Sequence, residues 1–149
     1  MHEIVSEIEI DASPQRVWSV LTDFASYPQW SAFIREVSGS ATRGARLRVV
    51  LQPPGGHAMT FRPTVLTADP ARELRWLGRL GLPRVFDGEH SLELRPLPGE
   101  RTQFVQSEEF RGLLVPLLAR TLGRTQQGFE SFNAALKKRV EELEGAPAA

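Results

Sequence analysis

A histidine, a glutamine and a glutamate on neighbouring predicted strands could carry out acid–base chemistry or hold the polar group of a ligand. In FDGEHSLEL, Phe86–Leu94, alternate residues share a face, and His90 is the polar residue on the apolar face. In the next strand, residues 102–112, Gln106 and Glu108 share a face with two phenylalanines, which marks that face as inward. The LPGE turn between the strands brings His90 close to Gln106 or Glu108.

Three interpretations of His90 follow from its position. The histidine could simply satisfy its hydrogen bonds with Gln106 or Glu108, since buried polar groups must find partners. It could instead orient the polar head of a mostly apolar ligand, as a few polar groups do in most ligand sites. If the protein is an enzyme, His90 and Glu108 are its acid–base pair, because histidine titrates near neutral pH. No nucleophile or third orienting group accompanies the pair, so the sequence assigns no catalytic residue otherwise.

Large apolar side chains are expected to line the space between the sheet and the last helix, either as plain core or as the wall of a ligand site. Tyr27 and Trp30, which flank Pro28 in YPQW after the first short helix, are expected near the mouth of that space. The full set of expected ligand-binding residues, together with His90, Gln106 and Glu108, is Tyr27, Trp30, Met59, Phe61, Trp76, Phe86, Phe110, Phe129 and Phe132.

The elements that would position these residues are one strand, two short helices, six strands and a long helix. Residues 2–10 alternate as a half-buried strand, and Ser13 with Pro14 forms a typical helix start. From about residue 33, period-two stretches separated by short turns predict an antiparallel meander. The result is an α+β fold.

A long helix is predicted over residues 118–143, where apolar residues recur at three- and four-residue spacing up to Leu143. Gly123 and Gly128 lie inside it, each costing about 1 kcal/mol relative to alanine. They indicate either close backbone packing or space left between helix and sheet. The apolar stretch at residues 112–122 is either buried or a partly exposed lip formed by Leu113, Leu114 and Val115.

Composition limits the function classes. The 149 residues suit one domain, predicted at 1–144 with a flexible tail at 145–149. Lys plus Arg and Asp plus Glu both number 18, so no strong charge excess favours nucleic acid. There is no cysteine, and the three histidines share no ligand spacing, so neither a metal site nor a cofactor is predicted. The alternating, acidic first ten residues and the absence of a long apolar run predict a cytoplasmic protein without membrane insertion.

A resemblance to a known superfamily rests on SPQRVWSVLTDFASYPQW, on FDGEHSLEL, on FVQSEEFRGLL and on the long last helix. The chain resembles the START/Bet v 1-like superfamily, in its SRPBCC (polyketide cyclase/dehydrase-like) branch. The resemblance implies the helix-grip fold: a curved antiparallel seven-stranded sheet wrapped around a long C-terminal helix, with two short helices after the first strand. It also implies a deep apolar cavity between sheet and helix.

Members of this superfamily carry lipids, sterols or polyketides, a minority cyclise or dehydrate polyketides, and others assist other proteins. The resemblance therefore implies binding or transport of a hydrophobic small molecule. The alternatives are a polyketide cyclase or dehydratase that uses His90 and Glu108, and an accessory protein-binding domain with a vestigial cavity. Monomer and homodimer both remain open.

Overall fold

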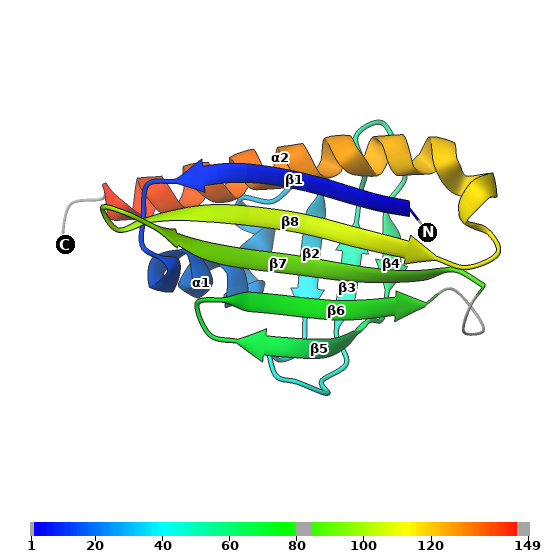
Figure 1. The fold of residues 1–149 in the computed structure, drawn as a ribbon, viewed down its shortest axis with the longest axis horizontal. Coiled ribbons are helices and arrows are strands. Elements are labelled where there is room, and N and C mark those ends of the chain that lie inside the picture. The colour runs from blue at the N-terminus through cyan, green and yellow to red at the C-terminus, as the bar shows by residue number, and fades with distance from the viewer. Residues whose placement is uncertain (1, 80–84, 146–149) are drawn as a thin grey trace.

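The computed structural model describes residues 2–79 and 85–145, without the side chains of 117–121. Figure 1 shows the elements in chain order. They are β1 (His2–Ile10), α1 (Pro14–Thr22), the 3₁₀ helix η1 (Phe24–Gln29), β2 (Ile34–Ser38), β3 (Arg48–Leu51), β4 (Met59–Phe61), β5 (Thr64–Asp69), β6 (Glu73–Arg79), β7 (Asp87–Leu97), β8 (Arg101–Arg111), the 3₁₀ helix η2 (Val115–Leu118) and α2 (Ala119–Glu144).

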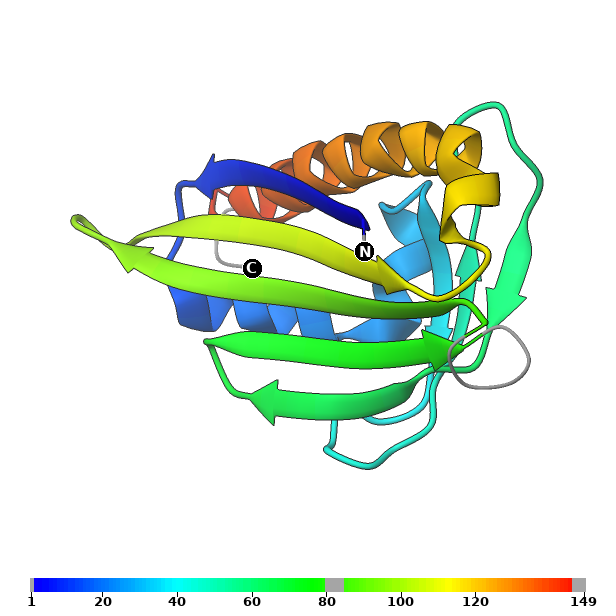
Figure 2. The ribbon, with the colours of Figure 1, turned by 45° about the vertical axis from the view of Figure 1, so that its right-hand side comes forward.

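The strands form two antiparallel sheets, and α2 packs mainly against β1 of the larger one (Figures 1 and 2). The larger sheet has the order β1-β8-β7-β6-β5, and the smaller has the order β2-β3-β4. The described residues thus form eight strands where seven were expected. The difference arises at Pro63, which has no N–H for the ladder, so the strand expected over 57–68 divides into β4 and β5. An isolated bridge from Arg46 to Thr64 joins the sheets.

The start of α1 matches the sequence prediction. The Oγ of Ser13 accepts a hydrogen bond from the backbone N–H of Arg16 at 3.3 Å, and Pro14 occupies the first helical position. This satisfies one N–H that the helix leaves without a partner. The second short helix is the 3₁₀ helix η1.

The predicted apolar stripe of α2 is buried over most of its length. Leu122, Phe129, Phe132, Leu136 and Val140 lie at most 3% exposed. Leu143 departs from the prediction, with 51% of its surface exposed. In Figure 1, α2 continues past the end of β1. No helix in the described part of the chain is both long and apolar enough to cross a membrane.

The two glycines of α2 differ. A Cβ built on Gly128 would lie within 3.0 Å of three ring atoms of Phe33, whereas one built on Gly123 would meet nothing within 4 Å. Gly128 therefore permits close packing of Phe33 against the helix backbone. Gly123 is exposed and faces open space.

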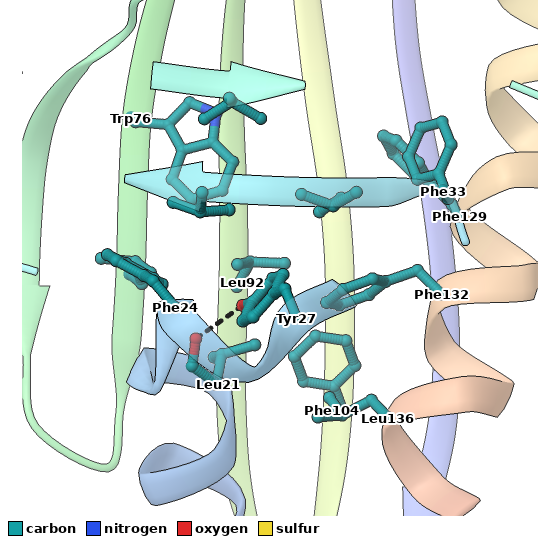
Figure 3. Packing of buried hydrophobic residues seen from close by; sticks show 14 of the residues in the cluster. Leu21, Phe24, Tyr27, Phe33, Trp76, Leu92, Phe104, Phe129, Phe132 and Leu136 are labelled. Atoms are coloured by element: carbon teal, nitrogen blue, oxygen red, sulfur yellow. Dashed lines mark hydrogen bonds between the residues drawn. The ribbon is translucent and has the colours of Figure 1, made fainter. Parts of the chain in front are cut away.

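Aromatic side chains fill much of the space between the sheet and α2. Figure 3 shows Phe33 beside Phe129, and Tyr27 and Phe132 farther along the same layer. The ring centroids of Phe33 and Phe129 are 5.9 Å apart, and those of Tyr27 and Phe132 are 6.0 Å apart. In this region the apolar residues pack as core.

Candidate functional site

His90 lies in the middle of β7, on the inward face of the larger sheet, and is 3% exposed. The indole of Trp76, its cross-strand neighbour on β6, stacks on the imidazole with 5.0 Å between ring centroids. Phe129 of α2 meets the imidazole edge-on at 5.1 Å. The ring is therefore held between two aromatic side chains and has little freedom to turn.

Both ring nitrogens of His90 contact β8. Nδ1 lies 2.9 Å from Oε1 of Glu108, and Nε2 lies 2.9 Å from Oε1 of Gln106. The strand register places Glu108 directly opposite His90, with Gln106 two residues along. The predicted proximity of these three side chains is confirmed.

The hydrogen bonds continue from Gln106 across the interior. Nε2 of Gln106 donates to Oδ1 of Asn133 at 2.7 Å, and Nδ2 of Asn133 donates to Oγ of Ser6 at 2.9 Å. We call the series Ser6, Asn133, Gln106, His90 and Glu108 the polar chain. It joins β1, α2, β8 and β7 through side chains alone.

Two members of the polar chain, Ser6 and Asn133, were not predicted from the sequence. A signal for each was present. Ser6 interrupts a strand face of isoleucines, and Asn133 follows Phe129 by four residues and so lies on the buried stripe of α2. A polar residue on an apolar face is the same clue that singled out His90.

The end of the polar chain at Glu108 is open. Oε2 of Glu108 has no hydrogen-bond partner among the described residues, and the side chain is 15% exposed. Gly88 makes room for this carboxylate, since a Cβ there would be closer to Oε2 than any van der Waals contact allows. Glu108 can therefore accept a hydrogen bond from a further group.

The electrostatics of the pair follow from its contacts. Both nitrogens of His90 face acceptor oxygens, so both contacts are hydrogen bonds when the ring carries two protons. That form is an imidazolium beside a carboxylate, a charge-assisted pair. The face of Trp76 stacks on the same ring.

Tyr27, expected near a mouth, is instead fully buried. η1 lies against α2, and the phenol donates to the backbone oxygen of Leu21 at 2.6 Å. Burial and the charge of Asp23 raise the pKa of Tyr27, so its phenol remains protonated over the ordinary pH range. Trp30 is half-buried, and its ring centroid lies 4.8 Å from that of Tyr27.

The remaining aromatic candidates divide into two groups. Phe86 and Phe110 stack with 5.6 Å between centroids, and Phe110 pairs across the strands with Gly88. Phe61 is half-buried and Met59 is 40% exposed. Met59 therefore lies outside the core, because β4 is the edge strand of the smaller sheet, and its expected part in lining a ligand site stays a prediction.

The predicted lip is also smaller than expected. Leu113 is 83% exposed, but Val115 is 8% exposed and Leu114 is half-buried. The backbone N–H of Leu114 donates to the oxygen of Val85 at 3.0 Å, which fixes this segment against the start of β7. The lip is one exposed leucine.

Two surface clefts have ligand-sized volumes of about 570 and 630 Å³. The first lies between the η1–β2 connection, the β3–β4 loop and α2, and the second between the start of α1, the β5–β6 turn and β7. The predicted site residues line neither cleft. Within the described ranges, no three histidine, aspartate or glutamate side chains form a metal-binding group.

A family model described as polyketide cyclase/dehydrase and lipid transport matches residues 1–141. The chain belongs to this family. The superfamily resemblance and the helix-grip architecture predicted from the sequence are thereby confirmed. No curated protein sequence matches the chain.

Solved structures of similar fold include proteins of different kinds. A START superfamily protein from Mycobacterium smegmatis is 24% identical, with coverage of 96% of this chain and 99% of that one, and a TM-score of 0.73. An aromatase/cyclase from a Streptomyces species is 18% identical, with coverage of 97% and 96% and a TM-score of 0.76. A point mutant of norcoclaurine synthase from Thalictrum flavum is 16% identical, with coverage of 97% and 96% and a TM-score of 0.75. At these identities the likeness shows a shared fold alone, and the function of each protein rests on its own site.

Proposed function

We propose that this protein binds a hydrophobic small molecule between the sheet and α2, with His90, Gln106 and Glu108 as the polar end of the site. The observation that carries the proposal is the open end of the polar chain. Oε1 of Glu108 contacts His90, and Oε2, the other oxygen of the same carboxylate, does not. A ligand with a hydroxyl or amine donor would complete it.

The other end of the polar chain supports this assignment. Ser6, Asn133 and Gln106 hold His90 from β1, α2 and β8, so the imidazole is fixed before a ligand arrives. His90 in turn orients the carboxylate of Glu108. A group held in place in advance loses little conformational entropy when it binds.

The surroundings of Glu108 suit an apolar body. Phe110 is 5% exposed, whereas its stacking partner Phe86 is half-buried and so more accessible. Leu113 adds exposed apolar surface where β8 ends. The family description, which includes lipid transport, agrees with such a ligand. A cytoplasmic location, as monomer or homodimer, belongs to the same proposal.

Fluorescence titration with 1-aminoanthracene, an apolar probe with one amine donor, tests the proposal. We expect saturable binding by the wild type and about tenfold weaker binding by Glu108→Gln, because a charged acceptor becomes neutral. Glu109→Gln is the matched control, since that glutamate faces outward and pairs with Arg111. Equal affinity of Glu108→Gln and wild type would contradict the role of Glu108. Native mass spectrometry of freshly purified protein would then identify a co-purified ligand.

A second candidate function is acid–base catalysis on a polyketide. The 2.9 Å contact between His90 and Glu108 favours it, because a carboxylate that orients an imidazole is a common acid–base arrangement. Turnover of a polyketide mimic, lost in both His90→Ala and Glu108→Gln with circular dichroism unchanged, would support this function. A protein that neither binds 1-aminoanthracene nor turns over the mimic would instead favour the accessory protein-binding role.

A further inference from the structure

We propose that the first surface cleft is a separate binding site, which takes an organic carboxylate with an apolar body. The cleft has a volume of about 570 Å³ and is bounded by the η1–β2 connection, the β3–β4 loop and Ser131 of α2. In Figures 1 and 2 the loop between β3 and β4 rises to the level of α2. The site is independent of the polar chain, none of whose members lines it.

An unpartnered buried hydroxyl marks the cleft. Ser31 lines it and is 6% exposed, and its Oγ has no hydrogen-bond partner in the part of the chain that the structure describes. The backbone N–H of Ser31 is satisfied by the oxygen of Tyr27 at 2.8 Å, so the residue is held in place while its hydroxyl is left over. Buried polar groups are nearly always paired, and an exception indicates a missing partner. Because this Oγ is itself enclosed, the side chain of Ser31 must turn toward the cleft for a ligand there to supply that partner.

An arginine without a carboxylate partner gives the cleft its charge preference. Nη1 of Arg35 donates to Oε1 of Gln52 at 2.7 Å, and Arg35 forms no ion pair within the described residues. The carboxylate in the cleft, that of Glu36, is opposed by Arg48 at 3.6 Å. The guanidinium of Arg35 keeps donors available and matches the planar geometry of a carboxylate.

Apolar, rigid residues line part of the cleft, beside the polar Gln52 and Ser131. Phe33 lies at its inner side, wedged against Gly128, and the prolines Pro28, Pro53 and Pro54 line its sides. The loop that carries two of them is pinned, because the N–H of Gln52 donates to the oxygen of Phe33 at 2.8 Å. Proline has little conformational freedom to lose. The apolar body of the ligand would lie against these prolines, since Phe33 itself is only 2% exposed.

Backbone ¹H–¹⁵N NMR titration of the full chain tests the site, with 4-phenylbutyrate and its neutral analogue 4-phenylbutanamide as probes. We expect saturable shifts of the Ser31, Arg35 and Gly55 amides with the acid, and no shift at His90. The analogue has the same body without the charge, so it should bind about tenfold more weakly, the usual loss when a charge-assisted hydrogen bond becomes neutral.

The matched variants are Arg35→Gln and Arg43→Gln. Both remove one exposed arginine charge, but Arg43 lies outside the cleft. Arg35→Gln should weaken 4-phenylbutyrate binding about tenfold, and Arg43→Gln should leave it unchanged. Decanoate in place of the aryl acid tells whether an alkyl body also fits.

Three results would overturn the proposal. These are shifts confined to β7 and β8, equal affinity for acid and amide, and the absence of saturable shifts at Ser31 and Arg35. None depends on whether the Glu108 site binds 1-aminoanthracene. Failure of either site is therefore distinguishable from failure of the other.

Discussion

The polar chain in the interior and the surface cleft lie on either side of the contact between Phe33 and Phe129. Buried polar groups are hydrogen-bonded in the first region, and one is left unbonded in the second. Along the polar chain every buried side chain from Ser6 to His90 has a partner on another element. In the cleft, the hydroxyl of Ser31 is buried without one. Phe129 contacts His90, and Phe33 contacts Phe129 and lines the cleft. The rings of Phe129 and Phe33 therefore separate the hydrogen-bonded polar chain from the unpaired hydroxyl of Ser31.

The comparison distinguishes polar residues that stabilise the fold from a polar residue that is left free to bind a ligand. A paired group contributes to stability, and its loss leaves its neighbours unsatisfied. An unpaired buried group lowers the stability of the unliganded protein, and that lost free energy is recovered only when a ligand binds the group. The two regions should therefore respond oppositely to mutation.

The largest effect is expected at the centre of the polar chain. Gln106→Leu would leave Nε2 of His90 and Oδ1 of Asn133 without their partner, at a position that is fully buried. We expect the free energy of unfolding to fall by about 4 kcal/mol, since each orphaned buried group costs about 1–3 kcal/mol. Urea denaturation followed by circular dichroism measures this. A loss below about 1 kcal/mol would show that the polar chain is not structural.

A smaller effect is expected at the contact between α2 and the cleft. Gly128→Ala puts a methyl group into the ring of Phe33, whereas Gly123→Ala meets open space. Overpacking costs about 1–3 kcal/mol, and alanine gains up to about 1 kcal/mol of helix propensity over glycine. Thermal unfolding should therefore show a lower Tm for Gly128→Ala and a raised Tm for Gly123→Ala. Equal shifts in both variants would mean that Phe33 yields easily.

The smallest effect is expected at Ser31, and its sign is what matters. Ser31→Ala removes a hydroxyl that makes no bond, so the stability should be unchanged or slightly raised. Ser6→Ala removes the partner of Asn133 and should cost about 1 kcal/mol. Paired urea titrations compare the two variants. If both lose the same stability, the hydroxyl of Ser31 has a partner in solution and the contrast between the regions disappears.

The sequence predicts the fold well because its signals are local and repeated. The N-cap at Ser13, the alternation around His90 and the stripe of α2 each follow from spacing along one element. The break at Pro63 could have been anticipated, because proline interrupts a strand ladder. The hairpin that joins β7 to β8 has a three-residue loop with Gly99 and Glu100 at positive φ. Alternation along the strands alone does not predict this loop geometry.

The candidate sites are harder to predict because they join distant segments. His90, Gln106 and Glu108 lie on adjacent strands, so a single turn sufficed to bring them together. Asn133 joins them only through the docking of α2, which no local pattern specifies. The cleft combines residues from the η1–β2 connection, the β3–β4 loop and α2, and Ser31 carries no periodic signal at all.

The pairing of β1 with β8 has a consequence for how the protein is made. Ile10 lies opposite Thr102, so about a hundred residues must be synthesised before β1 finds its partner, a delay of roughly 5–20 s on the ribosome. During that time β1 is an unpaired strand, open to association with other chains. Its face opposite the isoleucines carries three glutamates, Glu3, Glu7 and Glu9, and like charges on a waiting strand discourage such association. Two of these glutamates later bind side chains of β8, Glu7 with Gln103 at 2.6 Å and Glu9 with Arg101 at 2.5 Å, so charges that protect the nascent strand then help to hold it in place.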